Sequence, residues 1–320
     1  MARRLISVIA PAFNEEDCIE ELARQLTAVF DANDAYDFEV IVVENGSTDR
    51  TWELLEKIHD ADPRFKVVQL ARNFRMDGGI TAGLDYASGD AAVIMASDLQ
   101  DPPELITDFI KKWEEGYENV YMVVTKRGGT GPIRRFNSRA FYWVAGKLTD
   151  DRIPRNASDF RLVDRKVYET VRGMDERNRF VRGLFAWVGF RSVGIEHERP
   201  PRHGGESKAH SLKVIDLAFK GIFAHSYVPL KLITVSGLVL SALSALAFVV
   251  LTIVWLFSGV PFAGFGTIVS IVLLMFGVVF SMIGIVAEYV GLIYEEVKQR
   301  PNFVVRSTLG LPPGASGRSA

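Results

Sequence analysis

One stretch of the chain carries oxygen ligands directly after an apolar run. Val93–Met95 is apolar, and Asp98, Gln100 and Asp101 follow it, ahead of a pair of prolines. This pattern is typical of a buried strand that leads through a polar turn into a proline-started helix. Carboxylate and amide oxygens suit Mg²⁺ and Mn²⁺, which often bring a phosphorylated substrate with them. We interpret the stretch as a candidate metal site, with an ordinary helix cap as the alternative.

A second stretch pairs an acid with a base. Asn156–Leu162 is rich in small polar residues and places Asp159 and Arg161 on either side of Phe160. We predict a turn here that delivers both charged groups to a site.

Basic side chains gather in two further segments. The first has the sequence ERNRFVRG and the second ERPPRHGGESK; together they contain Arg177, Arg179, Arg182, Arg199, Arg202 and Lys208. Basic clusters are usually solvated helix faces, but these contain prolines and glycines where a surface helix would not. That favours loops that bind phosphate. The Gly-rich basic loop Lys126–Pro132 is either a lid over a phosphate or an ordinary surface connection.

Five apolar runs must position these residues. The runs alternate with segments of helical periodicity and short links, and they lie at Leu5–Ala10, Phe38–Val43, Phe65–Leu70, Ala91–Met95 and Val120–Thr125. Such alternation predicts a doubly wound, parallel α/β sheet, in which ligands bind beyond the carboxyl ends of the strands. Glycines 78, 79 and 83 in the third helical segment predict close packing. No dinucleotide or P-loop fingerprint follows any of the runs, which argues against an oxidoreductase or an NTPase of those types.

The charge of the chain is unevenly distributed although the formal net charge is only −2. Residues 1–125 hold 25 acidic and 11 basic residues, whereas residues 126–231 hold 11 acidic and 22 basic ones. This asymmetry predicts a metal on one side and anionic groups or a membrane surface on the other, and we expect no nucleic-acid partner. The single cysteine, Cys18, excludes an intramolecular disulfide. The short apolar stretch at the start of the chain reads as a first strand and not as a signal peptide.

A long uncharged region follows the basic half. No charged residue occurs from Leu232 to Ala287, and Ser258–Pro261 divides the region into two parts that each exceed the roughly 20 residues needed to span a bilayer. We predict two transmembrane helices at about 232–257 and 265–287, preceded by an amphipathic interface helix within 211–229. Lysines and arginines flank the hairpin on both outer ends, which places both termini in the cytoplasm.

The predicted organisation is therefore a cytosolic catalytic domain at 1–210, the interface helix at 211–229, the membrane hairpin at 230–290 and a cytosolic tail at 291–320. Small residues in the two spans suit helix–helix packing and make a homo-oligomer an expectation; they are Gly237, Ser241, Ser244, Ala245, Gly277, Ser281 and Gly284.

Taken in order, these segments resemble the polyprenyl-phosphate glycosyltransferases of inverting family two, a group that includes bacterial undecaprenyl-phosphate glucosyltransferases and dolichyl-phosphate mannose synthases. The resemblance runs from about Leu5 to Arg300. Its most specific motifs are PAFNEE (11–16), ENGSTD (44–49), DLQDPPE (98–104), SDFRL (158–162), RFVRG (179–183) and GESK (205–208). It implies a GT-A catalytic domain with a Rossmann-like, mostly parallel sheet.

The resemblance also implies roles for individual residues. The nucleotide-sugar would be bound by Pro11, Asn14, Glu16, Glu44, Asn45 and Asp98. Asp98 and Gln100 would hold Mg²⁺ or Mn²⁺ on the donor diphosphate. Asp159 matches the catalytic acid-base position, with Arg161 beside it. Phosphates of donor or lipid acceptor would be bound by Arg179, Arg182, Arg199, Arg202 and Lys208.

Two positions depart from the family pattern. Ala96 stands where the first acid of an Asp-x-Asp motif is usual, and Glu44-Asn45 stands where two aspartates are usual. Mg²⁺ commonly keeps waters and substrate oxygens as ligands, so metal binding can survive the loss of one acid.

The expected reaction is inverting transfer of a sugar from a nucleotide-sugar, with UDP-glucose favoured and GDP-mannose next, to a polyprenyl phosphate at the cytoplasmic face of the membrane. A catalytically dead scaffold that binds nucleotide-sugar or lipid is one alternative, supported by Ala96. A processive polysaccharide synthase is another, but its Q-x-x-R-W motif and additional spans are missing from the sequence.

Overall fold

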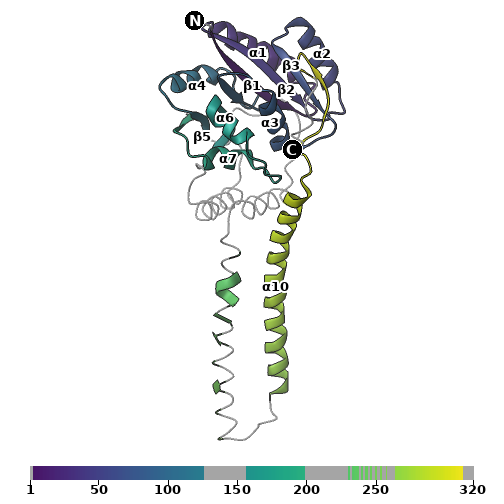
Figure 1. Ribbon diagram of the computed structural model, residues 1–320, viewed down its shortest axis with the longest axis vertical. Coiled ribbons are helices and arrows are strands. Elements are labelled where there is room, and N and C mark those ends of the chain that lie inside the picture. Colours follow the sequence, from purple (N-terminus) through teal and green to yellow (C-terminus); the bar gives the residue numbers. More distant parts are fainter. Residues whose placement is uncertain are drawn as a thin grey trace. The chain divides into compact units, whose positions relative to one another are not determined.

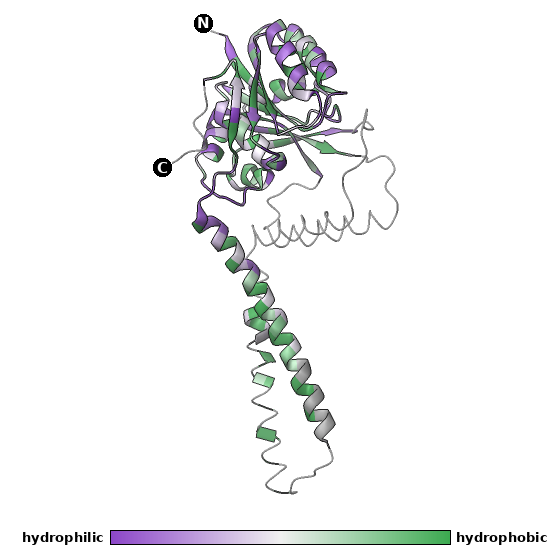
Figure 2. Cartoon of the chain, turned by 90° about the vertical axis from the view of Figure 1, so that its right-hand side faces the viewer, coloured by the Kyte–Doolittle hydropathy of each residue, from purple (hydrophilic) through white to green (hydrophobic). Residues whose placement is uncertain are grey.

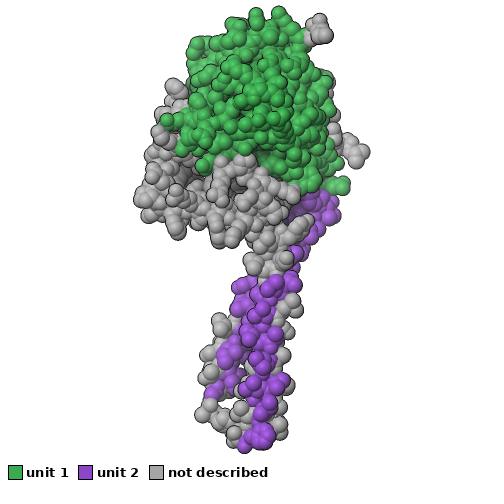
Figure 3. All heavy atoms as spheres, turned by 90° about the vertical axis from the view of Figure 1, so that its left-hand side faces the viewer, with its two compact units in different colours: residues 1–214, 299–320 green, residues 215–298 purple. Residues whose placement is uncertain are grey.

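The computed structural model describes residues 3–125, 156–198 and 264–312, together with scattered positions between 230 and 257 (Figure 1). The chain divides into two compact units, which Figure 3 distinguishes by colour. Residues 1–214 and 299–320 form the first unit, and residues 215–298 form the second. The predicted interface helix at 211–229 and the loop at 126–132 lie outside the described residues.

The first unit is built on a mixed eight-stranded sheet. Its strands are β1 (Arg4–Ala12), β2 (Tyr36–Glu44), β3 (Phe65–Leu70), β4 (Ala91–Ile94), β5 (Asn119–Val124), β6 (Ala157–Asp164), β7 (Ser192–His197) and β8 (Val305–Leu309). They lie in the order β7-β5-β6-β4-β1-β2-β3-β8. The pairs β1–β2, β1–β4, β2–β3 and β5–β7 are parallel, and the other three pairs are antiparallel. The prediction of an α/β domain with a mostly parallel sheet is confirmed.

Helices cover both faces of this sheet. One core packs beneath α1 (Ile19–Ala32), α2 (Thr51–Ala61) and α4 (Leu105–Glu114); the other packs beneath α3 (Arg75–Tyr86), α6 (Arg165–Arg172) and α7 (Val181–Trp187). Neighbouring residues of a central strand enter opposite cores: Val8 lies in the first and Ile9 in the second. This explains why the central strands read as continuous apolar runs.

Glycines bring α3 close to the sheet, as predicted. A Cβ atom on Gly83 would lie 2.2 Å from the Cγ2 atom of Ile9, and one on Gly79 would lie 2.9 Å from the Cβ atom of Pro11. Side chains at these positions would displace the helix, because contacts this short do not occur between real carbon atoms. The glycines therefore set the distance between the start of α3 and the end of β1.

The prediction of a turn at Asn156–Leu162 was wrong. Residues 157–164 form β6, which lies antiparallel between β4 and β5 and separates them. Phe160 and Leu162 are fully buried in one core, and Val163 is fully buried in the other. Small polar residues suggested a turn, but burial of these apolar side chains on both faces stabilises a strand. The fifth predicted strand, β5, is consequently not a neighbour of the fourth.

The chain beyond the second unit returns to the sheet. β8 pairs antiparallel with β3, and Phe303 just before it is only 1% exposed. The Ser307 hydroxyl donates to Oε1 of Gln69 at 2.7 Å. No strand was predicted in this segment, because its sequence has few apolar residues in alternation. Residues 299–309 of the predicted C-terminal tail therefore belong to the first unit, whereas residues 291–298 are the end of α10 (Phe265–Lys298).

The second unit contains one described helix that is long and apolar enough to span a membrane. α10 (Phe265–Lys298) has 34 residues, and its segment Met275–Lys298 has a hydropathy of 2.0 with none of it buried (Figure 2). It begins where the second predicted span begins and continues eleven residues past the predicted end at 287. Only scattered positions of the first predicted span, 232–257, are described, so the two-helix hairpin is not confirmed.

A buried carboxylate stabilises the sheet away from the predicted site, and it permits a stability prediction. Glu39 on β2 accepts hydrogen bonds from Ser7 Oγ (2.6 Å), Lys66 Nζ (2.7 Å) and Ser88 Oγ (2.7 Å). Burial alone would raise the pKa of Glu39, but the bonds from Lys66 and the serines outweigh it and the pKa is lowered. The ionised form is therefore the one that stabilises the fold.

We expect Glu39→Ala to destabilise the protein by roughly 3 kcal/mol, because it leaves Lys66 and two serines without their acceptor. The pKa is lowered on folding, so the part of this stabilisation that depends on the ionised carboxylate is present above the ordinary value of 4.5 and is lost as the pH falls through the lowered pKa. Melting temperatures measured at pH 7 and at pH 3.5 test both statements. Glu21→Gln is the control, since the ion pair of Glu21 with Arg24 is exposed. An equal deficit at both pH values would contradict the ionised-state explanation.

Candidate functional site

The carboxyl ends of β1, β2 and β4 lie at one edge of the sheet. Ala12 at the end of β1 is in register with Glu44 at the end of β2, and Ile9 is in register with Ile94 at the end of β4. The loops that follow these strands contain most of the residues predicted to bind nucleotide-sugar or metal. Parallel register thus brings three segments that are far apart in sequence to one edge.

Asn14 and Glu16 link the first two of these loops. The Asn14 N–H donates to Ser47 Oγ at 3.0 Å, and its Oδ1 accepts the Thr48 N–H at 2.8 Å. Asn14 has a φ of 55°, a conformation that asparagine tolerates better than most residues. Glu16 Oε2 accepts a hydrogen bond from Arg50 Nε at 3.2 Å. Through these contacts Asn14 and Glu16 hold the loop after β1 against the loop after β2.

Glu44 and Asn45 are buried, at 1% and 3% exposure. Glu44 accepts the N–H of Ser47, which closes the turn after β2. The Asn45 side chain accepts the Phe74 N–H and donates to the Arg75 carbonyl, both at 2.8 Å. These side chains are therefore engaged in holding the turn after β2 and the start of α3.

Side-chain hydrogen bonds from its own residues stabilise the turn after β4. Asp101 is 1% exposed, and its Oδ2 accepts the Ala96 N–H at 3.0 Å. Asp98 Oδ1 accepts the Gln100 N–H at 3.2 Å, and Ser97 Oγ donates to the Pro11 carbonyl at 2.8 Å. The turn from 96 to 101 is thus attached to the end of β1, and the half-buried Asp98 and Gln100 lie on it.

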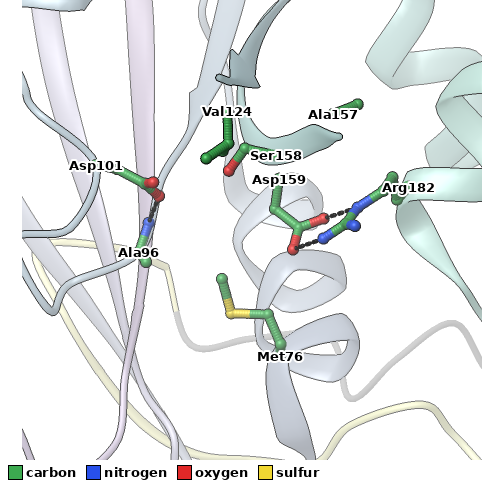
Figure 4. A pocket seen from close by; sticks show the side chains of 8 residues that line it. All are labelled: Met76, Ala96, Asp101, Val124, Ala157, Ser158, Asp159 and Arg182. Carbon is green, nitrogen blue, oxygen red and sulfur yellow. Dashed lines mark hydrogen bonds and ion pairs between the residues drawn. The ribbon is translucent and has the colours of Figure 1, made fainter. Parts of the chain in front are cut away.

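A pocket of about 70 Å³ opens beside this turn (Figure 4). Five elements or turns contribute side chains to it: α3, the turn after β4, β5, β6 and α7. The lining residues are Met76, Ala96, Asp101, Val124, Ala157, Ser158, Asp159 and Arg182. The pocket therefore joins the candidate metal-binding turn to two predicted site residues, Asp159 and Arg182.

Asp159 and Arg182 form a bidentate ion pair in this pocket. Arg182 Nε donates to Asp159 Oδ1 at 2.8 Å and Nη2 donates to Oδ2 at 2.6 Å (Figure 4). The Arg182 side chain is 26% exposed and the Asp159 side chain is 30% exposed, so solvent reaches both groups. A guanidinium fork matches a phosphate as well as it matches a carboxylate. Arg182 can therefore exchange Asp159 for an anionic ligand that enters the pocket.

Arg161 is not among the residues that line the pocket, and it is only 3% exposed. Its Nη2 donates to the Ser158 carbonyl at 3.0 Å and its Nε donates to the Asp159 carbonyl at 3.3 Å. Its guanidinium carbon lies 5.0 Å from the centre of the Phe185 ring. Burial lowers the pKa of Arg161 to about 10, with the charge of Asp159 opposing the shift, so the group stays cationic at neutral pH. Arg161 holds the backbone of β6 that carries Asp159.

Asp77 lies within electrostatic reach of the Asp159–Arg182 pair and of Arg179. Arg179 donates from Nη2 to the Val171 carbonyl at 2.5 Å, and burial lowers its pKa. Asp77, in the first turn of α3, accepts the Val181 N–H at 3.0 Å, and burial raises its pKa. The sequence did not single out Asp77, since an acid in the first turn of a helix is an ordinary feature there. Arg199, Arg202 and Lys208 lie outside the described residues.

The turn after β4 offers the kind of oxygen ligands that a hard divalent cation prefers, but it offers only a few of them. Asp98 and Gln100 offer a carboxylate and an amide oxygen, which suit Mg²⁺ or Mn²⁺. Within the described ranges, no group of three or more His, Cys, Asp or Glu side chains is placed to hold a metal ion. Any metal here would therefore need ligands from a bound diphosphate and water as well.

Comparison with known proteins gives consistent matches. The family model for glycosyl transferase family 2 matches residues 7–172. An uncharacterised glycosyltransferase of Bacillus subtilis, YkcC, is 40% identical over 95% of this chain and 94% of its own length. The SfII prophage-derived bactoprenol glucosyl transferase of Shigella flexneri is 34% identical over 95% of this chain and 98% of its own. Glucosyl-3-phosphoglycerate synthase from Mycobacterium tuberculosis, solved with Mn²⁺ and UDP-glucose, has a TM-score of 0.47 at 20% identity, covering 69% of this chain and 78% of that one.

Proposed function

Because the chain belongs to glycosyl transferase family 2 and is a glycosyltransferase, we propose that it transfers a sugar from a nucleotide-sugar to a polyprenyl phosphate, with inversion at the anomeric carbon. UDP-glucose is the donor we favour and GDP-mannose is the second. Bactoprenol is a polyprenol, and the Shigella flexneri relative with that word in its name matches nearly the whole chain. The observation that carries the proposal is the Asp159–Arg182 pair in a pocket beside the turn after β4.

The proposed step is a direct displacement. An oxygen of the lipid phosphate attacks the anomeric carbon of the donor sugar, the bond from that carbon to the diphosphate oxygen breaks, and nucleoside diphosphate leaves with the bonding electrons. A phosphate monoester has a second pKa near 6, so the attacking oxygen is mostly ionised at neutral pH. No strong base is needed, and positioning of charge becomes the main task of the protein.

Arg182 and Asp159 would carry out that positioning. In the pocket Asp159 neutralises Arg182 through two short hydrogen bonds. The phosphate of the acceptor would take one or both donors of Arg182, and Asp159 would then face the reacting centre. The buried Arg161 would keep the β6 backbone in place during this exchange.

Asp98 and Gln100 are the residues that would hold Mg²⁺ or Mn²⁺. When bound, the cation would neutralise charge on the diphosphate leaving group. The chain itself would supply the two oxygen ligands and the tied turn from 96 to 101 on which they lie.

We further propose that the reaction takes place at the cytoplasmic face of the membrane, with the catalytic unit and both termini in the cytoplasm. α10 supports a membrane location, and the flanking lysines and arginines support the orientation. Two membrane spans and a homo-oligomer are part of the same proposal. Confinement of enzyme and lipid to one surface would raise the effective concentration of their encounter.

A donor panel tests the proposed function. Purified protein in liposomes with undecaprenyl phosphate is given UDP-glucose, UDP-N-acetylglucosamine, UDP-galactose or GDP-mannose, with Mg²⁺, Mn²⁺ or EDTA, and lipid-linked sugar is measured. We expect product from one donor, most of all UDP-glucose, and none with EDTA. Nucleotide binding without transfer from any donor would overturn the proposal in favour of a membrane scaffold, the alternative that the alanine at position 96 supports.

A further inference from the structure

Asp77 caps a helix that belongs to a distant part of the chain. Its Oδ1 accepts the N–H of Val181, the first residue of α7, at 3.0 Å, across 104 positions of sequence. The first N–H groups of a helix have no partner within the helix. The residue at the N-cap position of α7 is Phe180, which makes no side-chain cap. Asp77 therefore supplies from α3 the acceptor that the local sequence lacks.

The helix that Asp77 caps carries Arg182 at its second position. α7 has only seven residues, and so short a helix gains little stability from its own hydrogen bonds. Its tertiary contacts decide where it begins: Val181, Leu184 and Phe185 are buried, and the Asp77 bond fixes the first N–H. The direction in which the Arg182 guanidinium leaves the backbone depends on this starting point.

Asp77 also belongs to the charge arrangement of the pocket. Asp159 on β6, Arg182 on α7 and Arg179 before α7 all lie close enough to influence it electrostatically. Its neighbour Met76 lines the pocket directly. Asp77 therefore lies within electrostatic reach of the Asp159–Arg182 pair, and it also holds the backbone of α7.

We propose that Asp77 is a positioning residue for sugar transfer: by capping α7 it places the Arg182 guanidinium where the acceptor phosphate must bind. This inference rests on the proposed function. Asp77 does not line the pocket, so it acts through Arg182 and not on the substrates. A displacement of about 1 Å in a positioning group can reduce the rate by roughly 10²-fold. Loss of the cap is therefore expected to lower kcat/KM for the polyprenyl phosphate acceptor.

The test uses full-length protein in liposomes and three variants. Asp77→Ala removes the acceptor, and Asp77→Asn keeps an oxygen that can accept the Val181 N–H. Asp164→Ala is the control: it removes the side-chain cap of the neighbouring helix α6 together with the acceptor of the Trp113 indole N–H. We expect Asp77→Ala to lower kcat/KM for the polyprenyl phosphate by roughly tenfold, while the KM for the donor changes less than about twofold. Asp77→Asn should recover most of the activity, and Asp164→Ala should leave both constants near wild type.

Two further measurements separate positioning from general stability. Hydrogen exchange should become faster in the peptide that covers 180–187 in Asp77→Ala, with β1 and α4 still protected. In an Arg182→Lys background, Asp77→Ala should cause little additional loss, because the group it positions is already changed. Should Asp77→Ala fail to fold, Asp77→Ser, whose hydroxyl oxygen is one bond nearer the backbone than the carboxylate oxygens of Asp77, replaces it.

The outcomes distinguish this inference from the proposed function. No lipid-linked product from the wild type with any donor would defeat the proposed function and the inference that rests on it. An active wild type whose acceptor kcat/KM is unchanged in Asp77→Ala would overturn the inference alone. Full additivity with Arg182→Lys, or an equal loss in Asp164→Ala, would also overturn it.

Discussion

Asp159→Ala is expected to lower the rate of sugar transfer by roughly 10²- to 10³-fold, the range associated with loss of one preorganised electrostatic group at a reacting centre. The substitution removes the carboxylate that faces the pocket and leaves Arg182 without the acceptor of two short hydrogen bonds. Arg182→Ala should cause a comparable loss through the acceptor, since it removes the fork that would bind the phosphate. Initial rates with saturating donor and varied polyprenyl phosphate measure both effects.

The pH dependence of Asp159→Asn separates two roles for the carboxylate. If Asp159 mainly orients groups and arranges charge, the loss in Asp159→Asn should be nearly constant from pH 7 to pH 9. The acceptor phosphate is mostly ionised over that range without help, because its second pKa is near 6. If instead the loss shrinks strongly with rising pH, a proton-accepting role dominates and the orientation role that we propose is wrong.

A second carboxylate–guanidinium fork in the same domain provides the control. Asp62 accepts two bonds from Arg64 Nε, at 3.0 and 2.9 Å, and one from Nη2 at 2.6 Å, outside the pocket. Asp62→Ala breaks the same kind of pair with similar solvent access and should leave transfer within about twofold of wild type. A loss like that of Asp159→Ala would mean that general stability, and not the pocket, explains the effect.

Removal of the divalent cation is expected to be the other large effect. EDTA, or Asp98→Ala, should lower transfer by roughly 10²- to 10³-fold, which is the size expected when several kcal/mol of charge stabilisation on the leaving group are lost. Asp98→Asn keeps an oxygen that can accept the Gln100 N–H and so preserves the turn, and it should lose nearly as much activity as Asp98→Ala. Wild-type activity in EDTA would refute a role for the metal.

Ala96→Asp offers a gain-of-function version of the same experiment. Position 96 lines the pocket, and the added carboxylate restores the acid that the family pattern usually has there. We expect the Mn²⁺ concentration for half-maximal activity to fall by roughly tenfold, as an additional charged ligand is added. Ala96→Asn, which adds similar volume without the charge, is the matched control. An unchanged metal requirement in Ala96→Asp would show that position 96 does not contact the ion.

The sequence by itself determined most of the sheet. All five predicted strands exist, because each buries most of its side chains in the two cores and therefore has a mostly apolar sequence. The parallel centre of the sheet follows from the alternation of these runs with helical periodicity. The glycines of α3 predicted close packing, since a missing side chain is visible in sequence; the short distance from Gly83 to Ile9 agrees with this. The family relationship was also visible, from several motifs in a fixed order.

Only the tertiary structure decided how the site is assembled. β6 was predicted as a turn, because local polarity outweighed Phe160, Leu162 and Val163 in the sequence, whereas burial between two strands decides the structure. The pairing of Asp159 with Arg182 joins residues 23 positions apart, and the cap from Asp77 to Val181 joins residues 104 apart. Neither contact leaves a local pattern, because a hydrogen bond between distant segments depends on how helices pack on the sheet and not on the residues beside it in the chain.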